Sequence, residues 1–139
     1  MLILRLLLSL LAGASATAAL APFNIVWLAP VAPLLLYLIL HFAPQRNAWL
    51  LSWSFGVGFF GAGVSWVFVS IYEHSATPLP LAVALTALFV SALALLFMLQ
   101  GWCWKRWFSG RWGALSFIGL WVLGEWLRSW LLTGFPWLY

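Results

Sequence analysis

The residues in this sequence whose types and spacing could do chemistry are few, because most of its side chains are apolar. Glu125 and Arg128 are three residues apart, so on a helix they lie on one face and can form an ion pair. Charge within a long apolar segment is costly unless it is paired or functional, and an arginine there can bind a phosphate or a carboxylate. The spacing therefore predicts a structural ion pair, a site for a lipid anion, or both.

The other reactive side chains form no convincing catalytic set. Glu73 and His74 are neighbours that could transfer a proton, but without a nucleophile beside them a solvated polar loop is the favoured interpretation. Cys103 has no histidine or carboxylate near it in the sequence to activate a thiolate. As the only cysteine, it also excludes an internal disulfide and a multi-cysteine metal site. We therefore predict no catalytic residue, no metal and no cofactor.

Composition indicates that lipid, rather than water, surrounds most of these residues. Of 139 residues, 66% are hydrophobic and 6% are charged, and the mean hydropathy is +1.09. Soluble domains have roughly 25% charged residues, and lipid tolerates apolar surface when the backbone is bonded internally, as in helices. The net charge of +4 favours membrane topology over nucleic-acid binding, because the basic residues are few and lie among tryptophans. We expect an all-α membrane protein.

Five apolar stretches are bounded by proline, polar or charged residues and approach the ~20 residues that a spanning helix needs. They cover about residues 2–20, 25–42, 48–72, 81–103 and 113–132. The first could be a cleaved signal peptide, since Arg5 precedes a leucine run and small residues follow, but four further spans favour its retention. The sequence therefore predicts one domain, a bundle of about five transmembrane helices with short loops.

The distribution of positive charge predicts the orientation of this bundle. Basic residues precede the first stretch or lie in the second and fourth connections, and they are Arg5, Arg46, Lys105, Arg106 and Arg111. Because cytoplasmic loops are enriched in Lys and Arg, the amino terminus is expected in the cytoplasm and the carboxyl end outside. Tryptophans are expected to anchor the helices at both membrane surfaces. Those at the inner surface are Trp49, Trp53, Trp102, Trp104, Trp107 and Trp112.

The third stretch contains the glycine-rich run GVGFFGAG. Ser54, Gly58 and Ala62 are spaced by four residues, which places three small side chains on one helical face where a neighbouring helix can approach closely. A phosphate-binding loop is a poor alternative, because no strand, acidic partner or Lys-Ser/Thr pair accompanies the glycines. The pattern therefore predicts helix packing.

Three sequence motifs carry a resemblance to a known family. They are AGASATAALAPFNIVWLAPVAPLLL, GVGFFGAGVSWVFVSIYEHSATPLPLA and GEWLRSWLLTGFPWL. In this order they resemble the amino-terminal membrane region of bacterial apolipoprotein N-acyltransferases, over nearly the whole chain. The resemblance implies a multispan bundle in the bacterial inner membrane that carries a periplasmic nitrilase-like domain with a Glu-Lys-Cys triad. Such an enzyme transfers an acyl chain from a phospholipid to the amino-terminal cysteine of a diacylglyceryl lipoprotein.

The resemblance also implies roles for particular residues. The catalytic domain would follow Tyr139, so this chain alone is expected to be inactive. Pro136 and Trp137 match the family's Gly-Phe-Pro-Trp motif and would lie at the periplasmic interface, where an aromatic ring can line the lipid entrance. Glu125 and Arg128 match its Glu-x-Leu-Arg pattern. The expected partners are therefore phospholipid and lipoprotein, with no nucleic acid.

Two other classes of function stay open from the residues alone. A small transporter or channel subunit could be built on the charged pair of the fifth stretch, although paired broken helices are not evident. A non-catalytic membrane scaffold could instead pack through the glycine face of the third stretch.

Overall fold

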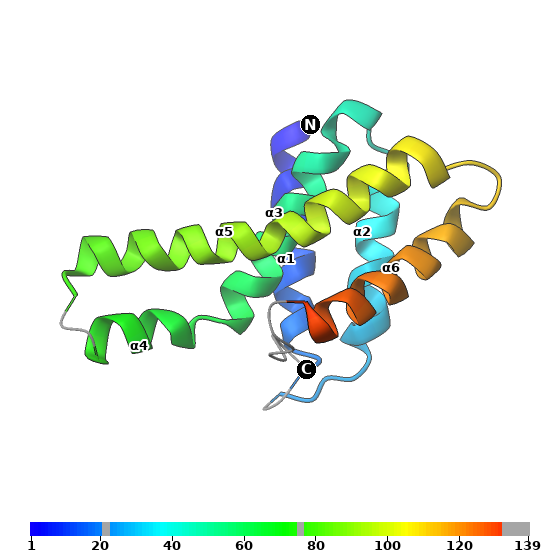
Figure 1. Cartoon of the computed structure of the whole chain (residues 1–139). Helices are drawn as coiled ribbons and strands as arrows, with labels where there is room; N and C mark the ends of the chain where they lie inside the picture. The colour runs from blue at the N-terminus through cyan, green and yellow to red at the C-terminus, as the bar shows by residue number, and fades with distance from the viewer. Residues whose placement is uncertain (21–22, 75–76, 132–139) are drawn as a thin grey trace.

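The chain is almost entirely helical in the computed structural model, which describes residues 1–20, 23–74 and 77–131. Within these ranges there are six α-helices and no strand, so the predicted all-α class is confirmed (Figure 1). The helices are α1 (Leu2–Thr17), α2 (Leu28–His41), α3 (Ala48–Gly63), α4 (Trp66–His74), α5 (Leu79–Cys103) and α6 (Gly113–Trp130). A short 3-10 helix, η1 (Gln45–Asn47), precedes α3, and a π-helix, η2 (Trp104–Phe108), continues α5.

The lengths of these helices bear on how many of them can cross a membrane. In the described part of the chain, one continuous helical segment, residues 79–108, is long and apolar enough to span alone. The bent pair of α3 and α4 gives a second candidate if the two helices form one span. The apolar helices α1 and α2 have 16 and 14 residues. The arrangement of five spans therefore stays a prediction.

The stretch 48–72, expected to form one span, is divided into two helices. α3 ends at Gly63, α4 begins at Trp66, and the chain bends by 56° between them. Each glycine costs about 1 kcal/mol in a helix interior relative to alanine, so the glycine-rich carboxyl half of α3 is a weak point. α4 has no buried residue, and with the first half of α5 it extends away from the other helices (Figure 1).

Close backbone packing joins α1 to α3 through glycines on both helices. A Cβ atom at Gly13 would lie 1.9 Å from the carbonyl oxygen of Phe55, and one at Gly58 would lie 2.0 Å from that of Leu10. No side chain can be accommodated at those distances, so the two backbones are in direct contact. Hydroxyl groups reinforce the contact, because Ser54 Oγ donates a hydrogen bond to the Leu6 carbonyl at 2.9 Å.

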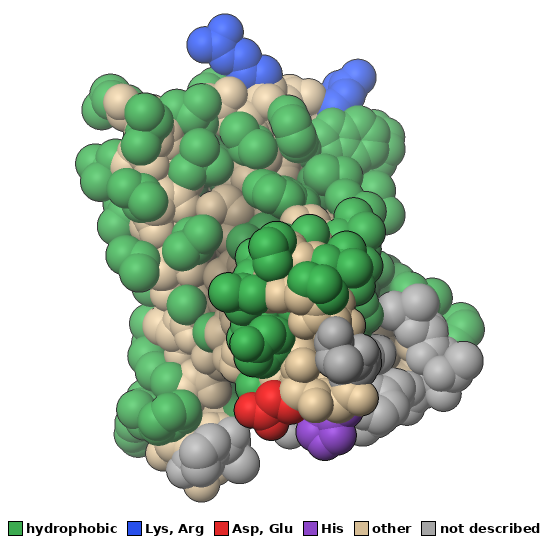
Figure 2. All heavy atoms as spheres, turned by 90° about the vertical axis from the view of Figure 1, so that its left-hand side faces the viewer, with side chains coloured by type: hydrophobic (Ala, Val, Ile, Leu, Met, Phe, Trp, Pro, Cys, Tyr) green, Lys and Arg blue, Asp and Glu red, His purple; other side chains and the backbone are tan. Residues whose placement is uncertain are grey.

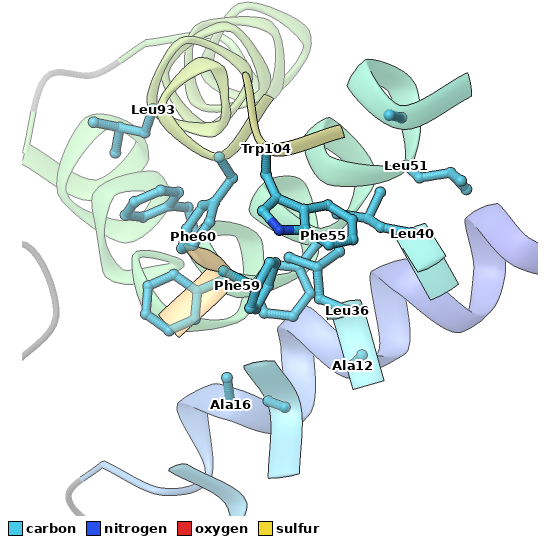
Figure 3. Close-up of a cluster of buried hydrophobic side chains, with 14 of the residues drawn as sticks. Ala12, Ala16, Leu36, Leu40, Leu51, Phe55, Phe59, Phe60, Leu93 and Trp104 are labelled. Atoms are coloured by element: carbon cyan, nitrogen blue, oxygen red, sulfur yellow. The ribbon is translucent and has the colours of Figure 1, made fainter. Parts of the chain in front are cut away.

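The opposite face of α3 packs on α5 through an aromatic cluster. The ring of Phe97 lies 5.2 Å from that of Phe55, 5.5 Å from Phe59 and 5.8 Å from Phe60, measured between centroids. Figure 3 shows the three phenylalanines of α3 gathered with Trp104 and the aliphatic side chains of neighbouring helices. α3 is therefore the central helix of the core, with α1 on one side and α5 on the other.

The segment after α5 connects three helices at one end of the bundle. Trp104 is fully buried, and its Nε1 donates a hydrogen bond to the Gly113 carbonyl at 2.8 Å. Lys105 Nζ donates to the Leu40 carbonyl at 2.7 Å and to the His41 carbonyl at 3.0 Å, which satisfies two acceptors at the carboxyl end of α2. The expectation that Trp104 is a surface anchor was wrong, because the π-helix turns this side chain inward.

The order of contacts along the helices gives their relative directions. α1 and α3 run parallel, since Ser9 lies beside Leu51 and, one turn later in both helices, Gly13 lies beside Phe55. α3 and α5 run antiparallel. Their contacts pair Ser52 with Gly101, Phe55 with Phe97, Gly56 with Ala94 and Gly61 with Val90.

Replacing Gly13 by alanine tests whether the α1–α3 contact determines stability. We expect Gly13→Ala to destabilise the folded protein by about 2 kcal/mol, because the new methyl group meets backbone that cannot rotate away. Gly119→Ala is the matched control within α6, since nothing lies within 4 Å of a Cβ there. By helix propensity the control should stabilise by up to about 1 kcal/mol. The measurement is thermal unfolding in detergent, and equal melting temperatures for the two variants would contradict the prediction.

Candidate functional site

Glu125 and Arg128 form an ion pair on α6, between Oε2 of the carboxylate and Nη2 of the guanidinium. The i, i+3 spacing brings the two side chains together on one face of the helix. Their surroundings differ, because the arginine side chain is 9% exposed and the glutamate side chain is 37% exposed. The positive charge is therefore the buried member of the pair.

Three aromatic rings from other helices hold the guanidinium in place. The Cζ atom of Arg128 lies 5.2 Å from the ring centre of Phe59, 5.2 Å from that of Phe97 and 5.8 Å from that of Phe60. The negative face of an aromatic ring attracts a cation, and the attraction reaches about 2 kcal/mol where water is excluded. The core of α3 and α5 thus positions a charge carried by α6.

One half of this guanidinium has no partner within the described residues. Nη1 of Arg128 is buried and donates no hydrogen bond to the described residues, whereas Nη2 faces Glu125. Leaving a buried donor unpaired costs about 1–3 kcal/mol, and more for a charged group. Such an atom calls for a physical explanation, because buried polar groups in folded proteins are almost always paired.

Arg128 lies at one end of a groove of about 190 Å³ between α5 and α6. The groove is apolar apart from the charged pair, Gln100 and Cys103. Its apolar lining consists of Leu96, Phe97, Leu99, Leu120, Leu123, Gly124 and Leu127. Glycine at position 124 leaves room for the amide, since a Cβ there would lie 2.7 Å from Oε1 of Gln100.

A second groove, of about 400 Å³, lies between α2 and α6. Its lining includes no charged residue, and Tyr37 contacts the ring of Phe117 edge-on at 5.4 Å. The other residues that line it are Pro30, Pro33, Leu34, Ala114, Ile118, Trp121 and Val122. This surface can contact apolar groups but provides no charge to orient them.

The remaining sequence-predicted residues lie apart from this pair. Glu73 and His74 are exposed and belong to the last turn of α4, so the polar connection begins later than expected. As neighbours on a helix they do not face each other. Cys103 is half-buried at the end of α5 and lines the α5–α6 groove. Pro136 and Trp137 lie outside the described residues.

The predicted packing face of α3 divides between buried and exposed positions. Ser54 and Gly58 are buried against α1, whereas Ala62 is exposed near the end of the helix. Sequence reasoning missed Gln100. The available signal was an amide side chain, the only one in the stretch 81–103, within an otherwise apolar segment.

Comparison with known proteins gives a consistent set of relatives. The family model described as the apolipoprotein N-acyltransferase N-terminal domain matches residues 12–139. The apolipoprotein N-acyltransferase of Azotobacter vinelandii is 44% identical over 96% of this chain and 27% of its own length. That of Coxiella burnetii is 46% identical over 95% of this chain and 28% of its own length. The chain thus spans little more than a quarter of the relatives that it matches.

The ion pair predicts an asymmetric response to substitution. Glu125→Gln leaves the buried guanidinium without its counter-ion, so we expect a loss of about 3 kcal/mol of stability. The double variant, Glu125→Gln with Arg128→Met, should recover at least half of this loss, because the buried charge is removed as well. Thermal unfolding of the two variants in detergent measures the difference. Finding the double variant less stable than Glu125→Gln would show that the two charges are not coupled in this way.

Proposed function

The chain belongs to the apolipoprotein N-acyltransferase N-terminal domain family, and from this premise we propose that it is the membrane-anchoring and lipid-access portion of such an enzyme. The full protein would transfer an acyl chain from a phospholipid to the amino-terminal cysteine of a lipoprotein. The observation that carries the proposal is the similarity to named N-acyltransferases over 95–96% of this chain.

The side chains of this chain support a role other than acyl transfer itself. Acyl transfer through a thioester needs a cysteine with a base beside it. Cys103 lies instead among leucines and Gln100 in the α5–α6 groove. We therefore infer that the chemistry is performed by residues beyond the 27–28% of the relatives' length that this chain matches.

Helix directions support a multi-pass arrangement with alternating spans. α1 and α3 run parallel, α5 runs opposite to α3, and the short segment containing η2 returns the chain into α6. Figure 2 shows Lys and Arg side chains at one end of the molecule and acidic and histidine side chains near the other. By the positive-inside rule the basic end is cytoplasmic, with the amino terminus, and α6 leads to the periplasm. The glycine contact with α3 also favours retention of α1 in the mature protein.

The charged pair supports lipid access at the periplasmic end. Arg128 is three residues from the end of the described chain, near the predicted outer surface, and a groove leads from it between α5 and α6. We propose that Pro136 and Trp137, which lie outside the described residues, line the lipid entrance together with Glu125 and Arg128. An arginine suits this position because its planar guanidinium group can donate two parallel hydrogen bonds to phosphate oxygens.

A transporter or channel subunit is the alternative that the fold tests most directly. Such proteins place binding sites between paired broken helices near the midplane of the membrane. Among the described helices there is one bent pair, α3 with α4, and the ion pair lies on α6 instead. This arrangement favours the acyltransferase proposal.

Cysteine labelling tests the proposed orientation. In a Cys103→Ser background, Thr77→Cys should react with a membrane-impermeant maleimide added to intact spheroplasts, because the connection between α4 and α5 is placed in the periplasm. Arg111→Cys, in the connection between α5 and α6, should react only after the membrane is made permeable. Reaction at both positions in intact spheroplasts would contradict the topology, and the reverse pattern would invert it.

Genetic complementation tests the function. In cells depleted of apolipoprotein N-acyltransferase, a full-length protein that carries this chain should restore N-acylation of a reporter lipoprotein. The 139-residue chain alone should restore none. Mass spectrometry of the lipidated amino-terminal peptide reads out both results. Acylation by the short chain would refute its predicted inactivity, and failure of the full-length protein would refute the acyltransferase proposal.

The same assay tests Trp137 through a paired substitution. In the full-length protein, Trp137→Ala should lower turnover about tenfold, which corresponds to about 1.4 kcal/mol of transition-state stabilisation. Trp107→Ala is the control, because Trp107 is 60% exposed at the opposite, basic end. Initial rates at matched expression decide the comparison, and equal rates would remove the reason to assign Trp137 to the lipid entrance.

A further inference from the structure

We propose that the groove between α5 and α6 binds one acyl chain of a glycerophospholipid, whose phosphate accepts hydrogen bonds from Nη1 of Arg128. The inference rests on the proposed lipid-access function and deepens it, because it assigns a defined lipid subsite to residues within this chain. Three features of the groove carry it: an unpartnered buried cation, a length of apolar wall, and an amide partway along that wall.

The unpartnered cation defines the charge of the ligand. The side chain of Arg128 is more than nine-tenths buried, and Nη1 has no acceptor in the described part of the chain. The phenylalanine rings around Cζ stabilise the charge but are at best weak acceptors for its N–H groups. An anionic oxygen would pair with Nη1 while Nη2 keeps its bond to Glu125.

The acidic side chains of the given sequence do not provide a partner for Nη1. The whole sequence has two acidic residues, Glu73 and Glu125, and the second already engages Nη2. Glu73 lies on α4, which extends away from α6. The guanidinium of Arg128 is the more deeply buried charge at this end of the groove.

The wall of the groove defines the rest of the ligand. It follows α6 from Arg128 back to Leu120, a rise of about 12 Å, and is lined mainly by leucines. Leu99 and Leu123 are 57% and 46% exposed, so the groove opens sideways to the surrounding membrane. The groove, with a volume of about 190 Å³, is too small to hold a helix, whose diameter is about 10–12 Å. It suits a single extended hydrocarbon chain.

Gln100 distinguishes an ester lipid from a free fatty acid. Its amide faces Gly124, one helical turn and about 6 Å along α6 from Arg128. A glycerophospholipid carries its ester carbonyl a short distance from its phosphate, so the amide can donate to the carbonyl while Arg128 binds the phosphate. A fatty acid held by its carboxylate would place methylene groups against this amide. The position of this amide one helical turn from Arg128 therefore favours a phospholipid over a fatty acid as the ligand.

Photoaffinity labelling of the full-length protein in detergent tests this subsite. The probe is a phosphatidylglycerol with a diazirine in one acyl chain, and the labelled peptides are mapped by mass spectrometry. We expect labels within residues 96–103 and 120–127. Unlabelled phosphatidylglycerol should compete strongly, a fatty acid weakly, and an uncharged diacylglycerol least. Stronger competition by the fatty acid would assign the anion as a carboxylate and overturn the phospholipid assignment, whereas equal competition by diacylglycerol would overturn the role of charge.

Paired variants separate the head of the lipid from its chain. Arg128→Gln should weaken labelling about tenfold, as expected for loss of a charge-assisted hydrogen bond, whereas Arg106→Gln at the exposed basic end should not. Leu123→Trp fills the groove without touching the ion pair and should abolish labelling there. Leu115→Trp, on an exposed part of α6 outside the groove, should leave it unchanged.

The outcomes distinguish this proposal from the function on which it rests. If Leu123→Trp folds, as its melting temperature will show, and still labels like the unchanged protein, the groove is not the lipid site. If Arg128→Gln labels as strongly as the unchanged protein, the anion contact is wrong. Acyl transfer is measured separately, so an unchanged full-length protein that labels in the groove but transfers no acyl chain would refute the acyltransferase function and leave the subsite standing.

Discussion

Direct contact between the backbones of α1 and α3 is the constraint on which the rest of this structure depends. At Gly13 and Gly58 there is no space for a side chain between the two helices, and serine hydroxyls bond across the same interface at neighbouring positions. In lipid, helices associate through close packing rather than through exclusion of water, so small residues set where two helices meet. Once α1 occupies this face of α3, the large side chains of α3 are turned towards α5.

The aromatic side chains of α3 then determine where charge can be placed. Phe59 and Phe60 lie close to Phe97 of α5 and surround the guanidinium of Arg128 on α6. The site is thus built from three helices, although its charged atoms come from one. The glycines that permit the α1 contact also weaken the helix, and α3 ends at Gly63.

Local patterns in the sequence predicted much of this structure, and long-range packing explains what they missed. The apolar stretches approximate the helices to within a few residues at most ends, and the i, i+3 spacing was sufficient to pair Glu125 with Arg128. The bend after Gly63 was missed because hydropathy continues unchanged through it. The burial of Trp104 depends on a π-helix and on Gly113, nine residues away, which no periodic pattern reveals. Likewise, the position of Gln100 opposite Gly124 requires the pairing of α5 with α6.

The unequal exposure of the ion pair explains why it does not complete its own site. A symmetric pair of buried charges would neutralise itself and leave little attraction for a third group. Here the two charges have unequal surroundings, because the guanidinium is enclosed by aromatic rings while the carboxylate is more than a third exposed. A guanidinium has five N–H donors, and one carboxylate oxygen satisfies only part of that capacity. An arginine that is paired on one side, and has no partner on the other among residues 1–20, 23–74 and 77–131, keeps its position in the fold and retains donors for an anion.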